Sequence, residues 1–248
     1  MTKKLQVPTE KCENEAVGIF SDLARTGQKI TGNNDEKLRE SLSRSKSKVY
    51  QLAVCNEWEY FCTMTIDGAK HDRHDLKAFR KKLSKWINNY NGKHKTSVKY
   101  LLIPELHKKD PNAWHIHGLL MGLPEKHLTA FTLADKLPHT MRKLLKDGRK
   151  LYNWCDYAAA FGWVSMERVQ NPEAVAHYIS KYVTKNLGAK IELNDHVYYC
   201  SKGLKRAVPV LKAHLQKDLD PDFINEHIAI KTVHSMREVM EYFTPPNS

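Results

Sequence analysis

Two histidines in one short segment have the types and spacing needed to bind a divalent metal ion. His115 and His117 lie in residues 114–120, which read WHIHGLL. In a β-strand, residues two apart point to the same face, so the two imidazoles would lie side by side. The pattern His-x-His is common by chance, and most instances are structural or solvent-exposed. Here the flanking residues are apolar, so two polar rings on this strand need partners, and a metal is one candidate.

A third metal ligand should come from a neighbouring strand. Glu105 follows the strand expected at 98–103 and would lie across a hairpin from His115. His107 is the alternative ligand, and an ordinary loop carboxylate is the alternative interpretation of Glu105. Histidines with one carboxylate suit Mn²⁺, Zn²⁺ or Co²⁺ by affinity, whereas phosphoryl chemistry in cells more often uses Mg²⁺. We therefore expect Mg²⁺ or Mn²⁺.

Two tyrosines form the second group of residues that could take part in a reaction. Tyr178 and Tyr182 are four residues apart, so on a helix they share a face. Lys181 and Lys185 each follow one of these tyrosines by three residues. The same pattern is typical of an amphipathic helix with aromatic packing and a solvated lysine edge, which is the competing interpretation.

The chemistry that such a helix could perform is transfer of a phosphodiester to tyrosine. A phenol, with a pKa of about 10, is a weak nucleophile at neutral pH. A nearby ammonium group favours the phenolate, and a divalent metal can polarise the scissile phosphate. The product is a covalent phosphotyrosine that conserves the energy of the phosphodiester, so a free 3′ hydroxyl can reverse the reaction. Two tyrosines on one face would permit two successive transfers.

These groups must be positioned by strands and helices, and the sequence predicts both. Alternating β-branched and aromatic residues predict strands, and apolar residues at helical spacing predict helices. The expected strands are 60–66, 98–103, 114–121, 163–169 and 197–200, and the expected helices are 35–54, 74–90 and 171–186. Asn171 and Pro172 are typical of a helix start. The alternation predicts an α+β fold with a central, mostly antiparallel β-sheet flanked by helices.

The chain divides into three expected parts. Residues 1–44 read as a basic N-terminal arm or helix, 45–206 as the domain with both chemical groups, and 207–248 as a helical C-terminal extension. The basic helix expected at 35–54 either contacts the DNA backbone or presents a solvated face. No Gly-x-x-x-x-Gly-Lys-Ser/Thr stretch is present, so unwinding of a duplex would need a separate helicase.

Composition restricts the partners and the compartment. Lys and Arg number 40 against 28 Asp and Glu, a net charge of +12 in 248 residues, which favours nucleic acid over a membrane surface as partner. The five cysteines are scattered and form no Cys-x-x-Cys pair, which argues against a disulfide framework and fits a reducing cytoplasm. No signal peptide and no apolar run of membrane-spanning length is present, so we expect no membrane partner.

Four segments in order resemble one family. HIHGLL at 115–120 and YISKYVTK at 178–185 look like the HUH endonuclease superfamily, and more narrowly like rolling-circle replication initiators of filamentous phages and plasmids. The segment YFCTMTID at 60–67 is similar to the first motif of these initiators, an aromatic-rich strand with Thr-x-Thr. SKGL at 201–204 is similar to a short segment that follows the tyrosine helix in phage-type members. The resemblance covers about residues 45–206.

The resemblance implies a role for each candidate residue. His115 and His117 would hold the metal together with an acidic or histidine ligand, for which Glu105 is the match. The family has members with one catalytic tyrosine and members with two, so Tyr178 and Tyr182 both fit, and Tyr178 is our first choice. Lys181 and Lys185 fit the helper position. The implied fold has an RRM-like core, with the histidines on a middle strand and the tyrosine helix beside the sheet.

The implied function is initiation of rolling-circle replication. Such a protein nicks single-stranded DNA or an origin hairpin, keeps the 5′ end on tyrosine and leaves a 3′ hydroxyl for a host polymerase, with a host helicase in trans, in a bacterial cytoplasm. A relaxase or single-strand transposase would use the same chemistry. A non-catalytic basic DNA-binding protein is a further alternative, which predicts that the histidines and tyrosines are replaceable. A zinc hydrolase lacks support, because no His-Glu-x-x-His or cysteine cluster is present.

Overall fold

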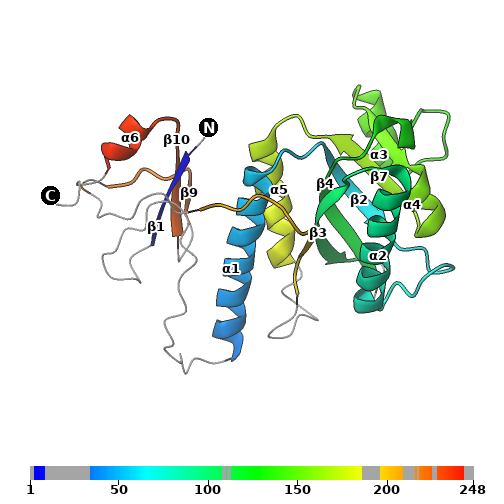
Figure 1. Ribbon diagram of the computed structural model, residues 1–248, viewed down its shortest axis with the longest axis horizontal. Coiled ribbons are helices and arrows are strands. Elements are labelled where there is room, and N and C mark those ends of the chain that lie inside the picture. The colour runs from blue at the N-terminus through cyan, green and yellow to red at the C-terminus, as the bar shows by residue number, and fades with distance from the viewer. Residues whose placement is uncertain are drawn as a thin grey trace. The chain divides into compact units, whose positions relative to one another are not determined.

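The computed structural model describes residues 3–8, 34–107, 110, 113–185, 196–208, 216, 218–224 and 228–242. The chain separates into two compact units (Figure 1). The larger unit is Gly32–Lys205, and the smaller unit combines Met1–Thr31 with Arg206–Ser248. Among the described residues, no helix is long and apolar enough to cross a membrane.

A seven-stranded sheet forms the centre of the larger unit. Its order is β5-β6-β7-β2-β4-β3-β8, and every neighbouring pair is antiparallel. The strands are β2 Tyr60–Thr65, β3 Lys99–Leu106, β4 Trp114–Met121, β5 Leu128–Ala130, β6 Leu151–Trp154, β7 Val164–Arg168 and β8 Tyr199–Cys200. The predicted α+β class with a central antiparallel sheet is confirmed. Strand β3 runs further than expected and therefore includes Glu105.

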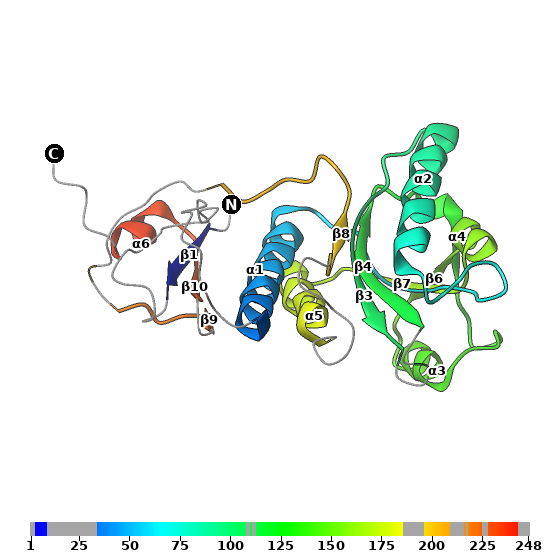
Figure 2. The same cartoon turned by 90° about the horizontal axis from the view of Figure 1, so that it is seen from below.

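Helices cover both faces of this sheet. They are α1 Asn34–Cys55, α2 Leu76–His94, α3 His139–Lys146, α4 Cys155–Ala160 and α5 Pro172–Lys185, with a short 3-10 helix at Glu125–His127. Helices α1 and α5 lie on one face and α2 and α4 on the other (Figure 2). The three long helices appear where the sequence predicts them. The segment 125–150, for which the sequence predicts no strand or helix, supplies the edge strand β5 and helix α3.

Alternation along β4 assigns its side chains to these two layers. Leu119 packs with α1 and α5, whereas Ile116 and Leu120 pack in the cluster that contains α2. Gly118 lies where β4 runs close to β3, since a Cβ there would come within 2.9 Å of the Leu101 carbonyl oxygen. The strand therefore places His115 and His117, which alternate with Ile116, on the face of Leu119.

Local signals account for the starts of α2 and α5. Asp75 accepts a hydrogen bond from the Ala78 amide at 2.9 Å at the start of α2, and Asn171 accepts one from the Ala174 amide at 2.9 Å at the start of α5. Both are N-cap bonds, which satisfy amides that have no partner within the helix. The predicted start of the tyrosine helix at Asn171 and Pro172 is confirmed.

The smaller unit contains a three-stranded antiparallel sheet. Strand β1, Lys3–Pro8, pairs with β10, Ile228–Val233, which also pairs with β9, Phe223–Ile224. Helix α6, Met236–Met240, follows β10. The expectation of an arm or helix at the N-terminus missed β1, and the expectation of a helical C-terminal extension missed β9 and β10. Pairing between segments so distant in sequence leaves no local pattern, because strand formation depends on the partner strand.

Candidate functional site

The strand register brings the predicted metal ligands to one face of the sheet. Glu105 on β3 is the cross-strand partner of His115 on β4, as the hairpin predicts. On the other side of β4, Thr63 pairs with His117 and Thr65 pairs with His115. Since α5 packs on this face, the tyrosine helix lies over the histidines.

His117 is held between two polar partners. Its Nε2 lies 2.7 Å from Oε2 of Glu105, and its Nδ1 lies 3.2 Å from the hydroxyl oxygen of Thr63. The side chains of His117 and Glu105 are mostly buried, at 12% and 15% exposure respectively. With Glu105 ionised, Nε2–H donates to the carboxylate and the Thr63 hydroxyl donates to Nδ1. These two bonds fix the orientation of the imidazole.

His115 contacts the alternative ligand that the sequence suggested. Its ring stacks on the ring of His107, with centroids 4.3 Å apart and an interplanar angle of 15°. Burial, helped by the neighbouring His107 and His117, lowers the pKa of His115 to about 4. His115 is therefore neutral at pH 7, which is the form of imidazole that binds metal ions.

The donor chemistry of this cluster fits a divalent cation, although the side chains are not arranged around one. Among the described residues, no three His, Cys, Asp or Glu side chains converge as a ligand set. Glu105 instead bonds directly to Nε2 of His117. Two imidazoles and one carboxylate on adjacent strands are suitable ligands for Mn²⁺, Zn²⁺ or Co²⁺. Thr63 would orient His117 from behind, as outer partners of ligating histidines do.

The two candidate tyrosines occupy very different environments. Tyr178 is 47% exposed, whereas Tyr182 is 5% exposed. The Tyr182 hydroxyl donates a hydrogen bond of 2.6 Å to the Tyr178 hydroxyl. The Tyr182 ring stacks on His117, with centroids 3.9 Å apart and an interplanar angle of 17°. Burial first, and then the bond to Tyr178, raise the pKa of Tyr182, so this side chain is a neutral phenol at physiological pH.

The predicted lysine helpers are placed only in part. Lys181 is exposed on α5, in the turn that follows Tyr178. Lys185 is the last residue of α5, and its side chain lies outside the described residues. Their role as helpers of the phosphoryl transfer stays a prediction.

Four further residues at the site were not assigned by sequence reasoning: Thr63, described above, Phe61, Arg149 and Glu167. Phe61 lies edge-on to Tyr178, with centroids 5.4 Å apart, and its cross-strand partner on β7 is Glu167. Glu167 accepts hydrogen bonds from both Nε, at 2.6 Å, and NH2 of Arg149. The pKa of Arg149 is raised chiefly by the hydrogen bonds and charge of Glu167, and less by Asp147 and Tyr178, while burial opposes the shift.

Only part of this group left a signal in the sequence. Phe61 and Thr63 belong to the aromatic Thr-x-Thr segment, but nothing in that segment says which ring or hydroxyl faces His117. Arg149 and Glu167 are 18 residues apart and match no pattern. Their contact arises because Arg149 precedes β6, which pairs with β7.

Comparison with known proteins gives one match. The family model of the ORF2-type replication-associated proteins matches residues 59–187, which is more than half of the 248-residue chain. No curated protein and no solved structure matches the chain. The matched segment contains β2, β3, β4 and α5, and with them every residue described at this site.

Proposed function

Because this chain belongs to the family of ORF2-type replication-associated proteins, we propose that it initiates rolling-circle replication as a metal-dependent, tyrosine-nucleophile endonuclease. The observation that carries the proposal is a continuous series of contacts from an exposed phenol to the predicted metal ligands. Tyr178 is bonded to Tyr182, Tyr182 stacks on His117, and His117 is bonded to Glu105. This member of a family of replication proteins therefore has a solvent-accessible tyrosine linked by contacts to a candidate metal site.

Tyr178 is the proposed nucleophile because this residue is exposed to solvent, whereas Tyr182 is buried. Its oxygen attacks the phosphorus at the origin, and the bond from phosphorus to the 3′ oxygen breaks. The 5′ end stays on Tyr178 as a phosphotyrosine, and the phenol proton is balanced by the proton on the new 3′ hydroxyl. The neutral Tyr182 donates to the attacking oxygen and so positions it.

The metal is proposed to be Mg²⁺ or Mn²⁺, held by His115, His117 and Glu105. When bound, it would supply positive charge that polarises the scissile phosphate. The protein's own contribution is to keep His115 neutral by burial and to orient His117 through Thr63. Loss of either feature would weaken the site without removing a ligand.

Arg149 is proposed to bind the phosphate that Tyr178 attacks. A guanidinium has five N–H donors, and Glu167 uses two of its nitrogens. Glu167 thereby fixes the plane of the guanidinium beside Tyr178 while leaving donors for a phosphate oxygen. Lys181 and Lys185, on the same helix as Tyr178, are proposed to add positive charge to this side of the site.

The proposed substrate is single-stranded DNA at an origin, exposed alone or in a hairpin, in a bacterial cytoplasm. Host helicase and polymerase would act in trans, since the sequence has no P-loop. A relaxase or a single-strand transposase would share the chemistry, but the family match is to replication-associated proteins.

The test is formation of a covalent protein–DNA adduct. Labelled single strands from the protein's own genetic element are incubated with Mn²⁺ or with EDTA and run on a denaturing gel. We expect an adduct that needs Mn²⁺, that is absent in Tyr178→Phe and His117→Ala, and that forms about tenfold more slowly in Tyr182→Phe.

The matched control is Tyr152→Phe, which removes a hydroxyl on the other face of the sheet, where Tyr152 packs against Tyr60. This variant should form the adduct like the wild type. Tight DNA binding with no adduct on any origin-containing strand would contradict the proposal and support a non-catalytic DNA-binding protein. An adduct retained in Tyr178→Phe and lost in Tyr182→Phe would identify Tyr182 as the nucleophile.

A further inference from the structure

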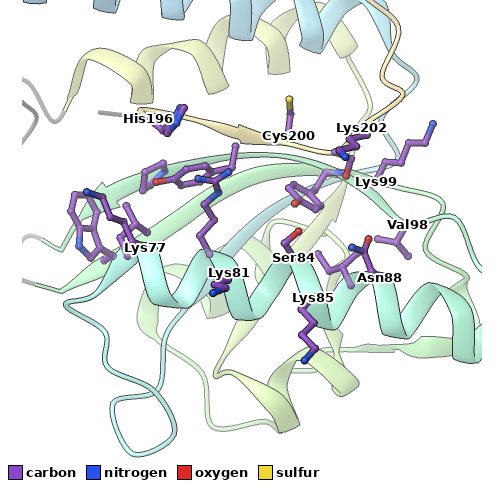
Figure 3. Close-up of a pocket in the computed structure, with 18 of the residues that line it drawn as sticks. Lys77, Lys81, Ser84, Lys85, Asn88, Val98, Lys99, His196, Cys200 and Lys202 are labelled. Carbon is purple, nitrogen blue, oxygen red and sulfur yellow. The ribbon is translucent and has the colours of Figure 1, made fainter. Parts of the chain in front are cut away.

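A long basic groove lies between helix α2 and the edge of the sheet, and we call it the α2–β8 groove. It has a volume of about 1700 Å³ and is lined by α2, by both ends of β3, and by β8 with the residues that follow it (Figure 3). Helix α2 packs on Leu102 and Ile116, whereas the tyrosine helix packs on Leu101 and Ile103. The groove is therefore formed mainly with the helix on the face of the sheet opposite to Tyr178, and Val183 of α5 also lines it.

Positive charge dominates the lining of the groove. Six cationic side chains line it against two carboxylates, Asp72 and Asp75; the cations are Lys77, Arg80, Lys81, Lys85, Lys99 and Lys202. Lys77, Lys81 and Lys85 recur at every fourth residue of α2, so consecutive lysines are about 6 Å apart along the helix axis. Lys99 and Lys202 come from the opposite wall, near the end of β8 (Figure 3). A groove with cations on both walls is suited to a polyanion.

The neutral groups of the groove favour phosphates over unstacked bases. Ser84 and Asn88 lie on the α2 wall and offer hydrogen-bond donors (Figure 3). The Tyr199 ring, on the β8 wall, is covered by the guanidinium of Arg80, 4.6 Å from the ring centroid. Single-stranded DNA is usually bound by open aromatic faces on which its bases stack. Tyr100 and Trp114, which also line the groove, are half-buried against the apolar core. Charge and hydrogen bonding are therefore the main means of recognition here.

One sequence motif has its place in this groove. The segment 201–204, SKGL, follows the tyrosine helix in sequence, and its last residue, Leu204, packs in the core cluster that contains Tyr182. Ser201 and Lys202 line the groove, and Lys99 donates a hydrogen bond of 3.0 Å to the Gly203 carbonyl. The Ser201 hydroxyl accepts a bond of 2.9 Å from the Tyr100 amide. The motif thus builds the wall opposite α2.

The groove also reaches the end of the sheet that carries the candidate site. Pro104 and Trp114, which line it, are the chain neighbours of Glu105 and His115. Their side chains point to the opposite face, since strand residues alternate. A DNA backbone that follows the groove would therefore approach the predicted metal ligands around the end of β3 and β4.

We propose that the α2–β8 groove binds the sugar–phosphate backbone of double-stranded DNA next to the single strand that is cut. The proposal rests on the proposed function, since it assigns the groove to the same DNA substrate. The duplex is held by charge, without base contacts, and its unpaired continuation is delivered to Tyr178. Contacts of this kind set position and affinity and carry no sequence information.

The test compares two triple variants of equal charge change. The groove variant is Lys77→Ala, Lys81→Ala and Lys202→Ala, and the control variant is Lys82→Ala, Lys93→Ala and Lys126→Ala. All six lysines are exposed, and the control lysines do not line the groove. Alanine is compatible with an exposed helical position, so both variants should fold. Fluorescence anisotropy measures the Kd for a labelled duplex with a single-stranded tail and for the tail alone, over a range of salt concentrations.

We expect the groove variant to bind the tailed duplex about tenfold or more weakly than the control variant near 0.1 M salt. The slope of log K against log salt should become shallower by about two to three, because each lost phosphate contact contributes about 0.9. Binding of the tail alone, and the rate of adduct formation on it, should stay within about twofold of the wild type. Equal loss in both variants, or equal loss for tail and duplex, would overturn the proposal.

The same measurements separate this inference from the proposed function. Adduct formation on the tail alone reports the endonuclease without the groove. If the wild type forms no adduct but the groove variant still loses duplex binding selectively, the endonuclease proposal fails and the groove assignment stands. If the adduct forms and the groove variant binds the duplex like the control variant, the groove assignment fails alone.

Discussion

The two faces of the seven-stranded sheet differ in what their side chains contact. On the α5 face, polar and aromatic groups contact one another: Glu105, His117 and Thr63 in one group, Tyr182 and Tyr178 in the next. Both faces bury an apolar cluster, but the cluster on the α2 face contains more aromatic rings, and polar side chains there gather in the groove at its edge. Alternation along β2 and β4 supplies both faces from one stretch of sequence.

This difference separates the residues that stabilise the fold from those that carry chemistry. Half-buried polar groups reduce stability unless they find partners, and here they find one another. The α2 face compensates by burying large rings such as Phe79, Trp154 and Tyr157, each at 1% exposure or less. Substitutions on the two faces should therefore change different measurable quantities.

The largest effect on stability is expected for Phe79→Ala on the α2 face. Phe79 is 1% exposed and lies edge-on to Phe161, with centroids 5.5 Å apart, so the substitution leaves a cavity. The free energy of unfolding should fall by about 3–5 kcal/mol in urea denaturation. Phe131→Ala, which removes a half-buried ring packed on Trp163, is the control and should cost less. An equal loss in both variants would show that the α2 face is not the main core.

The next effect is expected for Arg149→Ala on the α5 face. Loss of the guanidinium beside Tyr178 should slow single-turnover adduct formation by about a hundredfold, with little change in the free energy of unfolding. Arg149→Lys should recover only part of the rate, because an ammonium cannot form the paired bonds to Glu167. The exposed Arg142 on α3 supplies the control, Arg142→Ala. If both alanine variants react at the same rate, Arg149 has no role in binding the phosphate.

The smallest effect is expected for Thr63→Val, which removes only the hydroxyl that orients His117. Affinity for Mn²⁺, measured by calorimetry, and the adduct rate should each fall by about tenfold. Thr65→Val is a close control, since Thr65 lies on the same strand and face but donates to the Trp163 carbonyl oxygen at 2.9 Å. Identical Mn²⁺ affinities in the two variants would show that Thr63 has no specific role in metal binding.

Much of the architecture follows from the sequence alone. Spacing within one element decides which residues share a face, so His115 with His117, and Tyr178 with Tyr182, could be paired without a structure. The antiparallel α+β class, the start of α5 and the hairpin partnership of Glu105 with His115 also followed from local patterns, and the structure confirms them.

The tertiary structure decided which of these residues are buried and what they contact. It places Tyr182 against His117 and leaves Tyr178 exposed, although the two tyrosines occupy equivalent positions in the repeated Tyr-x-x-Lys pattern. It also joins Arg149 to Glu167, and β1 to β10, between segments that share no local pattern. The reason is that spacing fixes a direction relative to the element's own axis, whereas burial and contact depend on where another element packs.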